Sequence, residues 1–250
     1  MKVNSIDDPG RVKELRLLIK RKGFLSQFYS EIYERYRATL NRSPKDGIAL
    51  ELGSGAGFVK EVLPDIVTSD VISYSGVDRK LDACDMPFEN EALRAILMFD
   101  VFHHIPDVER FLNEAQRCLK PGGRCLIIDP YLGWLTTPIF KFIHHEPFHP
   151  EALDWRFDSK GPLSDANVAL AWMVFKRDRE KFKKLFPALE IVSISPHSPL
   201  RYWFAGGLRS WSLMPSRSFR FMTKIDSMLV GMTPRLASFM DIEIVKLPNR

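Results

Sequence analysis

The strongest constraint on the fold of this chain is a short apolar run that ends in an acid. Three glycines at alternate positions follow it directly. The segment reads A-L-E-L-G-S-G-A-G over residues 49–57. The pattern predicts a buried strand, a tight turn and the start of a helix, because glycine adopts positive φ and lets a ligand approach the bare backbone. A helix beginning there would present free N–H groups. The sequence therefore predicts a nucleotide-like ligand at this turn.

The spacing of the glycines separates two classes of nucleotide site. A dinucleotide fingerprint reads G-x-G-x-x-G or G-x-G-x-x-A, and Phe58 occupies its third conserved position when the count starts at Gly53. A nicotinamide oxidoreductase is therefore disfavoured. The chain also lacks the G-x-x-x-x-G-K-[ST] motif of a phosphate-binding P-loop.

The observed form, E-x-G-x-G-x-G, resembles the glycine loop of the class I S-adenosylmethionine-dependent methyltransferases. In that family the loop passes under the methionine part of the cofactor, and the acid lies near its amino group. The resemblance implies cofactor contacts at Glu51, Gly53, Ser54, Gly55 and Gly57. The alternative is a glycine-rich turn without a ligand.

A second strand is predicted over residues 65–70, and it ends in Asp70. Asp70 follows Gly53 by 17 positions, close to the offset of about 20 expected for an acid that binds ribose hydroxyls. A carboxylate suits this role because it accepts two hydrogen bonds from a vicinal diol. Asp78, after a possible short strand at residues 76–77, is the competing candidate.

The segment D-A-C-D-M-P-F over residues 82–88 resembles the D-A-x-x-[LM]-P-F segment of a large methyltransferase subfamily. There the aspartate accepts a hydrogen bond from the adenine amino group, and the next backbone N–H meets a ring nitrogen. The resemblance places these roles on Asp82 and Ala83. The alternative is a proline-terminated turn.

Residues 92–100 predict another strand, and its end at Phe99 and Asp100 is expected to line the cofactor cleft. The following F-H-H-I-P-D is similar to the L-H-H-[IL]-x-D segment of the same family. Neighbours at i and i+1 do not face the same way in a strand or a helix. We therefore expect one packed and one cleft-facing histidine at His103 and His104, and no metal.

The run L-K-P-G-G-R over residues 119–124 predicts a helix end and a turn into a strand at 125–129. It resembles the segment before the fifth strand of the methyltransferases. Together the motifs cover about residues 47–130. The fold class implied is α/β, with a Rossmann-like, seven-stranded, mainly parallel sheet flanked by helices.

The remaining segments are expected to complete that fold. Residues 10–41 predict helices, which in this family often cover the cofactor cleft. Another helix is predicted from Asp165 to Lys184, with Ser164 or Asp165 as its cap. Residues 190–194 and 239–245 predict the last two strands, one of them antiparallel.

Length and composition favour one methyltransferase domain over residues 1–250, with insertions at 131–164 and 197–235. The hydrophobic content of 45% suffices for a sizeable core. Three cysteines do not make a disulfide framework. The chain has no apolar run of the length a membrane span needs, and its start lacks the apolar stretch of a signal peptide. We expect a cytoplasmic protein.

The first insertion carries F-I-H-H-E-P-F-H over residues 142–149. Imidazole and carboxylate are common zinc ligands, but Pro147 would interrupt a helix that aligned them, so no metal is expected. One interpretation places this loop over the active-site mouth with a histidine facing the substrate. The other is a polar surface turn.

The second insertion mixes many aromatic residues with arginines. Three interpretations stay open: a helical lid with buried aromatics, contact with an anionic membrane or lipid-linked substrate, and stacking on nucleic-acid bases. Nucleic acid is the least favoured. The formal charge of +5 permits an acidic partner without requiring one.

These observations predict a methyltransferase that uses S-adenosyl-L-methionine and releases S-adenosyl-L-homocysteine. The sulfonium is already activated, so alignment and desolvation are the main requirements. A hydroxyl acceptor would be helped by a general base, for which the candidates are His104, His145 and His149. A small molecule, a sugar and a lipid-linked compound all stay open as the acceptor. The alternative function is a non-catalytic sensor or partner subunit that binds the same cofactor.

Overall fold

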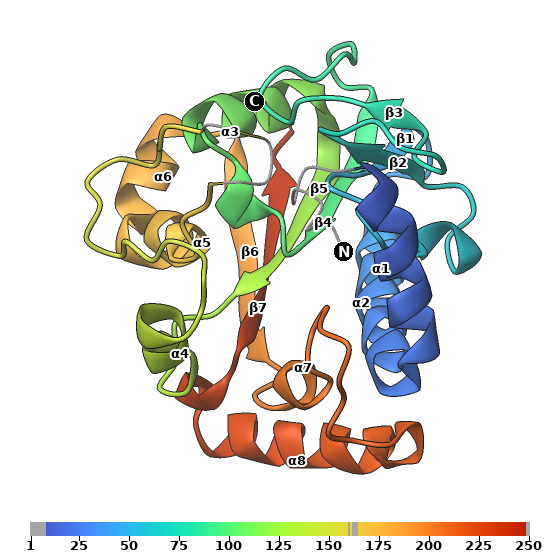
Figure 1. Ribbon diagram of the computed structural model, residues 1–250. Coiled ribbons are helices and arrows are strands. Elements are labelled where there is room, and N and C mark those ends of the chain that lie inside the picture. The colour runs from blue at the N-terminus through green and yellow to red at the C-terminus, as the bar shows by residue number, and fades with distance from the viewer. Residues whose placement is uncertain (1–8, 160, 162–164, 249–250) are drawn as a thin grey trace.

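Seven strands form one sheet in the order β3-β2-β1-β4-β5-β7-β6 (Figure 1). The computed structural model describes residues 9–159, 161 and 165–248. The strands are β1 (Ile48–Glu51), β2 (Val67–Asp70), β3 (Arg79–Lys80), β4 (Leu93–Phe99), β5 (Leu119–Pro130), β6 (Leu189–His197) and β7 (Phe239–Lys246). Neighbours among β1–β5 pair in parallel, whereas β7 is antiparallel to β5 and β6. The expected mainly parallel sheet is confirmed.

Helices cover both faces of this sheet. They are α1 (Pro9–Arg21), α2 (Gly23–Arg42), α3 (Val108–Cys118), α4 (Thr136–Phe142), α5 (Leu170–Trp172), α6 (Arg179–Leu185), α7 (Arg201–Phe204) and α8 (Phe219–Met232). Figure 1 shows α4, α7 and α8 together at the lower end of the sheet, where β5 ends. The segments expected as insertions therefore gather at the carboxyl ends of the parallel strands.

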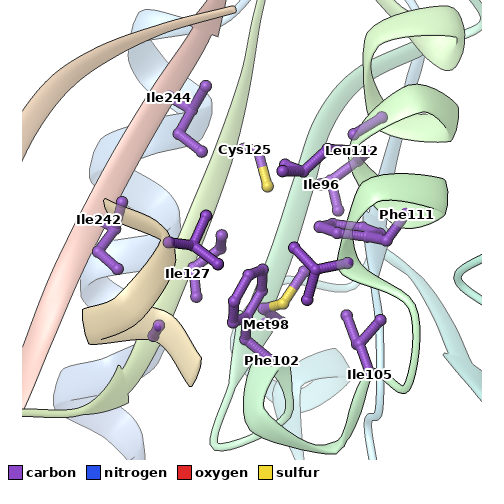
Figure 2. Packing of buried hydrophobic residues seen from close by; sticks show 14 of the residues in the cluster. Ile96, Met98, Phe102, Ile105, Phe111, Leu112, Cys125, Ile127, Ile242 and Ile244 are labelled. Carbon is purple, nitrogen blue, oxygen red and sulfur yellow. The ribbon is translucent and has the colours of Figure 1, made fainter. Parts of the chain in front are cut away.

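Alternate residues of the central strands supply two separate cores, because successive side chains of a strand point to opposite faces. Ile96 and Met98 of β4 pack with Phe102 and with Phe111 of α3 on one face (Figure 2). Leu97, between them in sequence, packs on the other face with the aromatic side chains of α2. Both faces of the strands are buried, which explains why they read as nearly continuous apolar runs.

The segment after the glycine loop differs from the prediction. A helix was expected to start there, but only a three-residue 3-10 turn, η1 (Val59–Glu61), is present. Pro64 lies three positions beyond it, and proline disfavours helical backbone at the residue before it. Since β2 already begins at Val67, the chain has no room for a longer helix.

Two other boundaries differ from the prediction. The strand at residues 76–77 is absent, and the short edge strand β3 follows at Arg79–Lys80. The L-K-P-G-G run belongs to β5, because α3 ends at Cys118 and Leu119 already pairs with Leu93.

Among the residues that the structure describes, none of the helices combines the length and apolar character needed to cross a membrane.

The helix expected from Asp165 begins only at Leu170, and its middle is the π-helical stretch η3 (Met173–Arg177). The Asn167 side chain explains the late start. Its Oδ1 accepts hydrogen bonds from the N–H groups of His149 and Ala169, at 3.0 and 3.1 Å, which fixes the preceding residues outside the helix. Ser164, one of the two expected caps, lies outside the described residues.

Arg201 fixes the 197–235 segment to the rest of the fold. Its side chain is 3% exposed, and its Nε donates to Asp226 Oδ2 of α8 at 2.7 Å. Its Nη2 donates to Glu31 Oε1 of α2 at 3.0 Å. A buried guanidinium needs this full set of carboxylate partners, so the base of the segment is part of the folded body.

Replacing Asp226 with alanine is expected to destabilise the protein strongly, because it leaves a buried charge with one of its two carboxylates missing. Loss of one partner of a buried ion pair costs about 3–5 kcal/mol, and the remaining Glu31 places this case near the lower end. Urea unfolding would measure it. Glu180→Ala, which removes an exposed pair with Lys183, is the control and should leave the midpoint unchanged. Equal midpoints for the two variants would contradict this account of Arg201.

Candidate active site

One large cavity opens at the carboxyl ends of the parallel strands. Its volume is about 1050 Å³, enough for a nucleotide-sized ligand together with a small molecule. The glycine loop and the ends of β2 and β4 line one side, and residues of segments 139–146 and 202–211 line the other. Open α/β sheets bind their ligands at this edge.

The glycine loop turns bare backbone toward the cavity. Gly53 and Gly55 have φ of 63° and 47°, values that L side chains disfavour. The loop is held to β2 because the Ser54 N–H donates to the Ser69 carbonyl at 2.9 Å. A Cβ added at Gly55 would meet nothing closer than the Gly53 carbonyl oxygen at 3.7 Å. A side chain at Gly55 would therefore project into the open cavity.

Glu51, at the end of β1, is a buried carboxylate on the cavity wall. Its relative exposure is 4%, and its Oε2 has no hydrogen-bond partner among the described residues. Burial raises the pKa of Glu51 to about 7, and the nearby Asp70 carboxylate adds to the rise. A cationic group in the cavity would supply the missing partner.

Asp70 and Asp78 have different roles in the structure. Asp70 lines the cavity, and its Oδ2 accepts from the Gly55 N–H at 3.0 Å and from the Tyr74 hydroxyl at 3.2 Å. Asp78 instead accepts from the Thr68 N–H at 2.9 Å and is absent from the cavity lining. Of the two candidates that the sequence left open, Asp70 therefore lines the cavity and Asp78 does not.

Asp82, Ala83 and Phe99 also line the cavity. The Cys84 N–H donates to Asp82 Oδ1 at 2.8 Å, which holds the carboxylate in a local turn. Asp100 follows Phe99 with a φ of 60°, a left-handed conformation tolerated mainly by glycine, asparagine and aspartate. Burial raises the pKa of Asp100 to about 7. The strand end therefore brings a second partly protonated carboxyl group to the cavity.

Aromatic side chains that the sequence did not assign to the site cover the cavity. Tyr29 and Tyr33 reach it from α2, and Tyr202 and Trp203 reach it from α7. The Tyr33 hydroxyl accepts the Phe58 N–H at 2.9 Å, which ties α2 to the glycine loop. The expectation that residues 10–41 cover the cleft agrees with this position. The helical spacing of apolar residues over 10–41 predicted helices but did not indicate which face of a helix would meet a ligand.

The three histidines proposed as bases occupy different positions. His104 and His145 line the cavity. His149 is outside the lining, and its side chain is 62% exposed. His103 is buried, and its Nδ1 lies 3.0 Å from Asp129 Oδ1. The expectation of one packed and one cleft-facing neighbour thus fits, but both rings also approach one carboxylate, that of Glu146. The sequence argument that they face different ways does not hold, because they lie in the 3-10 turn η2 (Phe102–His104).

Comparison with known proteins identifies the domain. Residues 50–127 match the family model described as "Methyltransferase domain". A demethylmenaquinone methyltransferase of Tropheryma whipplei is 27% identical over 100 residues, which cover 33% of this chain and 42% of that protein. A ubiquinone biosynthesis O-methyltransferase of Paramagnetospirillum magneticum is 27% identical over 136 residues, 47% of this chain and 54% of that protein. The matches thus span about half of these relatives' own length.

A solved structure agrees in fold. Geranyl diphosphate C-methyltransferase of Streptomyces coelicolor has a TM-score of 0.50 and 14% identity, covering 89% of this chain and 81% of that chain. At this identity the likeness concerns the fold alone. The domain match over residues 50–127 and the order of the sheet together identify this part of the chain as a class I S-adenosylmethionine-dependent methyltransferase domain.

Proposed function

We propose that the protein transfers a methyl group from S-adenosylmethionine to an apolar small molecule. One observation carries the cofactor assignment: Glu51, Asp70, Asp82 and the bare backbone at Gly55 all face a single cavity. These are the residue types and positions that the family resemblance assigns to the methionine, ribose and adenine parts of the cofactor. The solved relative with the same fold is described in complex with S-adenosyl-L-homocysteine.

The residues fit the cofactor chemically. Glu51 offers an unpartnered buried oxygen to the cofactor's ammonium group. Asp70 Oδ1 accepts the Ile72 N–H at 3.1 Å, and the second lone pair of this oxygen leaves it acceptor capacity for a ribose hydroxyl. Asp82 and the Ala83 backbone would meet the adenine. We propose these residues, with Gly53, Ser54, Gly57 and Phe99, as the cofactor site.

The chemistry requires positioning more than acid–base catalysis. The bound cofactor supplies an activated methyl group on a sulfonium, and the acceptor atom attacks it in line. The chain contributes alignment, because the glycine loop and Glu51 hold one reactant while the opposite wall holds the other. The aromatic cover of Tyr29 and Tyr202 excludes water from the reacting groups.

For a hydroxyl acceptor, His104 is the favoured base among the candidates. Its Nδ1 lies 3.2 Å from the Asp165 carbonyl oxygen, and a carbonyl only accepts, so Nδ1 carries the proton and Nε2 is the free acceptor. Burial lowers the pKa of His104 to about 4, which keeps the ring neutral at physiological pH. His145 is the more exposed second candidate.

The acceptor half of the cavity carries an apolar wall beside the polar side chains of His144, His145 and Glu146. This wall is formed by Ile139 and Phe140 of α4, by Ile143 just beyond it, and by Tyr202 and Trp203 of α7. The Phe140 and Trp203 rings lie 6.2 Å apart. Such walls favour an apolar acceptor, and two relatives are named for quinone pathways. We propose one domain over residues 1–250, with 10–41 as its cap and 131–164 and 197–235 as acceptor-side segments.

Asp82→Ala is expected to weaken S-adenosylhomocysteine binding by about 1–3 kcal/mol, since a buried polar group of the ligand loses its acceptor. Calorimetry would measure the dissociation constant. Asp85→Ala is the matched control, because Asp85 is exposed in the same loop and outside the cavity lining. Unchanged affinity for Asp82→Ala would show that the adenine end is misplaced.

The outer face of α8 supports peripheral contact with an anionic membrane, from which an apolar acceptor would be drawn. Phe221, Met228 and Met232 are each more than half exposed on this helix. Arg220 and Lys224 are exposed on the same helix. Apolar side chains flanked by basic residues are typical of interfacial helices.

We expect the protein to co-sediment with anionic vesicles and to be released by high salt, because screening weakens the contribution of the basic residues. The double variant Phe221→Ser/Met232→Ser should lose binding. Val192→Ser, an exposed apolar position on β6, is the control and should retain it. If the wild-type protein does not sediment with the vesicles, membrane contact is contradicted. A freely diffusing acceptor then remains the proposal.

Turnover separates this proposal from the non-catalytic alternative. The protein would be incubated with methyl-labelled S-adenosylmethionine and with lipid, glycan and metabolite fractions of cells. Transfer of label to one fraction, with release of S-adenosylhomocysteine, is the expected result. Cofactor binding without transfer to any fraction would favour the sensor or partner subunit.

A further inference from the structure

The Glu146 carboxylate lies among four histidines, an arrangement that methyl transfer as described above does not use. Glu146 Oε2 is 3.5 Å from His103 Nε2 and 3.6 Å from His144 Nδ1. Glu146 Oε1 is 3.7 Å from His104 Nε2 and 3.9 Å from His145 Nε2. These separations are long for N–H···O hydrogen bonds, which are usually 2.7–3.2 Å. The groups face one another without closing direct hydrogen bonds.

Two of these histidines are oriented by acceptors on their other nitrogen. His103 Nδ1 lies 3.0 Å from Asp129 Oδ1, and His104 Nδ1 lies 3.2 Å from the Asp165 carbonyl oxygen. Metal-binding histidines characteristically donate one ring N–H to a carboxylate or a carbonyl and present the other nitrogen to the metal. Both Nε2 atoms here approach the same carboxylate, so two oriented lone pairs and an acid converge on one point.

The charges at this point also favour a cation. The ion pairs of Asp129 and Glu146 in the described part of the chain are all with histidines. Carboxylates taken out of water need a compensating positive charge.

We propose that His103, His104 and Glu146 bind a divalent transition-metal cation such as zinc at the edge of the cavity. The three ligand atoms lie within 4.8 Å of one another. Ligand atoms about 2.0–2.2 Å from a tetrahedral zinc stand roughly 3.3–3.6 Å apart. The two imidazole–carboxylate separations are near this range, at 3.5 Å for His103 and 3.7 Å for His104, each to a different oxygen of Glu146. Two imidazoles and one carboxylate suit zinc or its neighbours better than magnesium or calcium.

The position of this site gives the cation a role. His104 and Glu146 line the cavity, so a fourth coordination position would be open to an oxygen of the acceptor, as in catalytic zinc sites. A coordinated hydroxyl loses its proton more readily, and His104 would then act as a ligand instead of a base. This role rests on the proposed methyl transfer, whereas metal binding itself does not.

Metal binding is tested on the full-length protein after dialysis against a chelator. Zn²⁺ titration by calorimetry should show one equivalent bound per chain, and Co²⁺ should give visible d–d absorption bands that Zn²⁺ abolishes. His104→Ala and Glu146→Gln should lose both signals. Asp129→Asn, which removes only the orienting carboxylate, should weaken affinity by about 10- to 100-fold. His149→Ala is the control and should bind normally, because His149 is outside the cluster.

Binding of S-adenosylhomocysteine by the same samples separates the two proposals. Metal-free protein and the ligand variants should still bind it, which shows that they are folded. Wild-type protein that binds S-adenosylhomocysteine but gives no cobalt bands and no zinc heat would overturn the metal site and leave methyl transfer standing. The cluster would then be a protonated His103 between Asp129 and Glu146. Zinc binding that persists in both His104→Ala and Glu146→Gln would also overturn the proposal.

Discussion

Gly55→Val is expected to weaken S-adenosylhomocysteine binding strongly in a protein that still folds. The added side chain would project into the cavity, since the nearest atom to a Cβ there is 3.7 Å away. Two further methyl groups would occupy space that the cofactor needs, and overpacking of this kind costs roughly 1–3 kcal/mol or more. We expect affinity to fall by about two orders of magnitude in calorimetry.

The stability of the folded protein should fall much less than its affinity for the cofactor. A residue with a side chain at φ of 47° costs about 1–2 kcal/mol, which lowers the melting temperature by roughly 2–8 °C in a domain of this size. Gly57→Val is the matched contrast. A Cβ there would lie 2.6 Å from the Tyr33 hydroxyl and 3.0 Å from the Ser54 carbonyl oxygen, so this variant should be destabilised even without ligand. Undiminished binding by Gly55→Val would mean that the cofactor does not cross this loop.

Affinity for S-adenosylhomocysteine is expected to rise as the pH increases from 5.5 toward 7 and to level off above it. Burial raises the pKa of Glu51 to about 7, and only the ionised carboxylate pairs with the ligand's ammonium group. Binding below this pKa must remove a proton, so affinity changes by up to about tenfold per pH unit. Calorimetry in buffers of different ionisation enthalpy would measure both affinity and proton release.

Glu51→Gln is the control for that measurement. The affinity of this variant for S-adenosylhomocysteine should be lower than that of the wild-type protein at pH 7.5 and should change little with pH. The same residue affects the stability of the free protein with a defined sign. Because the folded pKa of Glu51 lies above the ordinary 4.5, the native state holds the proton more tightly, and stability falls as the pH rises from 4.5 to 7.

The loss of stability integrates to about 3 kcal/mol for a shift of this size. In the absence of ligand, Glu51→Gln should therefore lose less stability than wild type over that pH range, as urea unfolding would show. Parallel pH profiles for the two proteins would contradict the role given to Glu51.

The sequence predicted the sheet well, because each signal was local. The apolar run before Glu51 and the run ending at Phe99 needed only their own residues to indicate buried strands. The helix after the glycine loop was mispredicted because Pro64 outweighed the motif. The late start at Leu170 depended on the Asn167 side chain, which closes bonds to His149 that no local pattern reveals.

The cavity residues were predictable where a motif carried them. Asp70 and Asp82 lie at the cavity as expected. The grouping of His104 with Glu146 was not predictable, because it joins two segments 42 positions apart and requires a 3-10 turn that brings adjacent rings to one carboxylate. Similarly, no periodicity distinguished buried Arg201 from the exposed arginines of the same segment.

Calorimetric titration of the purified protein with S-adenosylhomocysteine and, separately, with NAD tests the central claim most directly. The E-x-G-x-G-x-G loop, the unpartnered oxygen of Glu51 and the position of Asp82 predict saturable binding of S-adenosylhomocysteine and none of NAD. Phe58, in place of a third glycine, disfavours the dinucleotide. No heat with S-adenosylhomocysteine, or saturable binding of NAD, would contradict the assignment of this cavity to a methyltransferase cofactor.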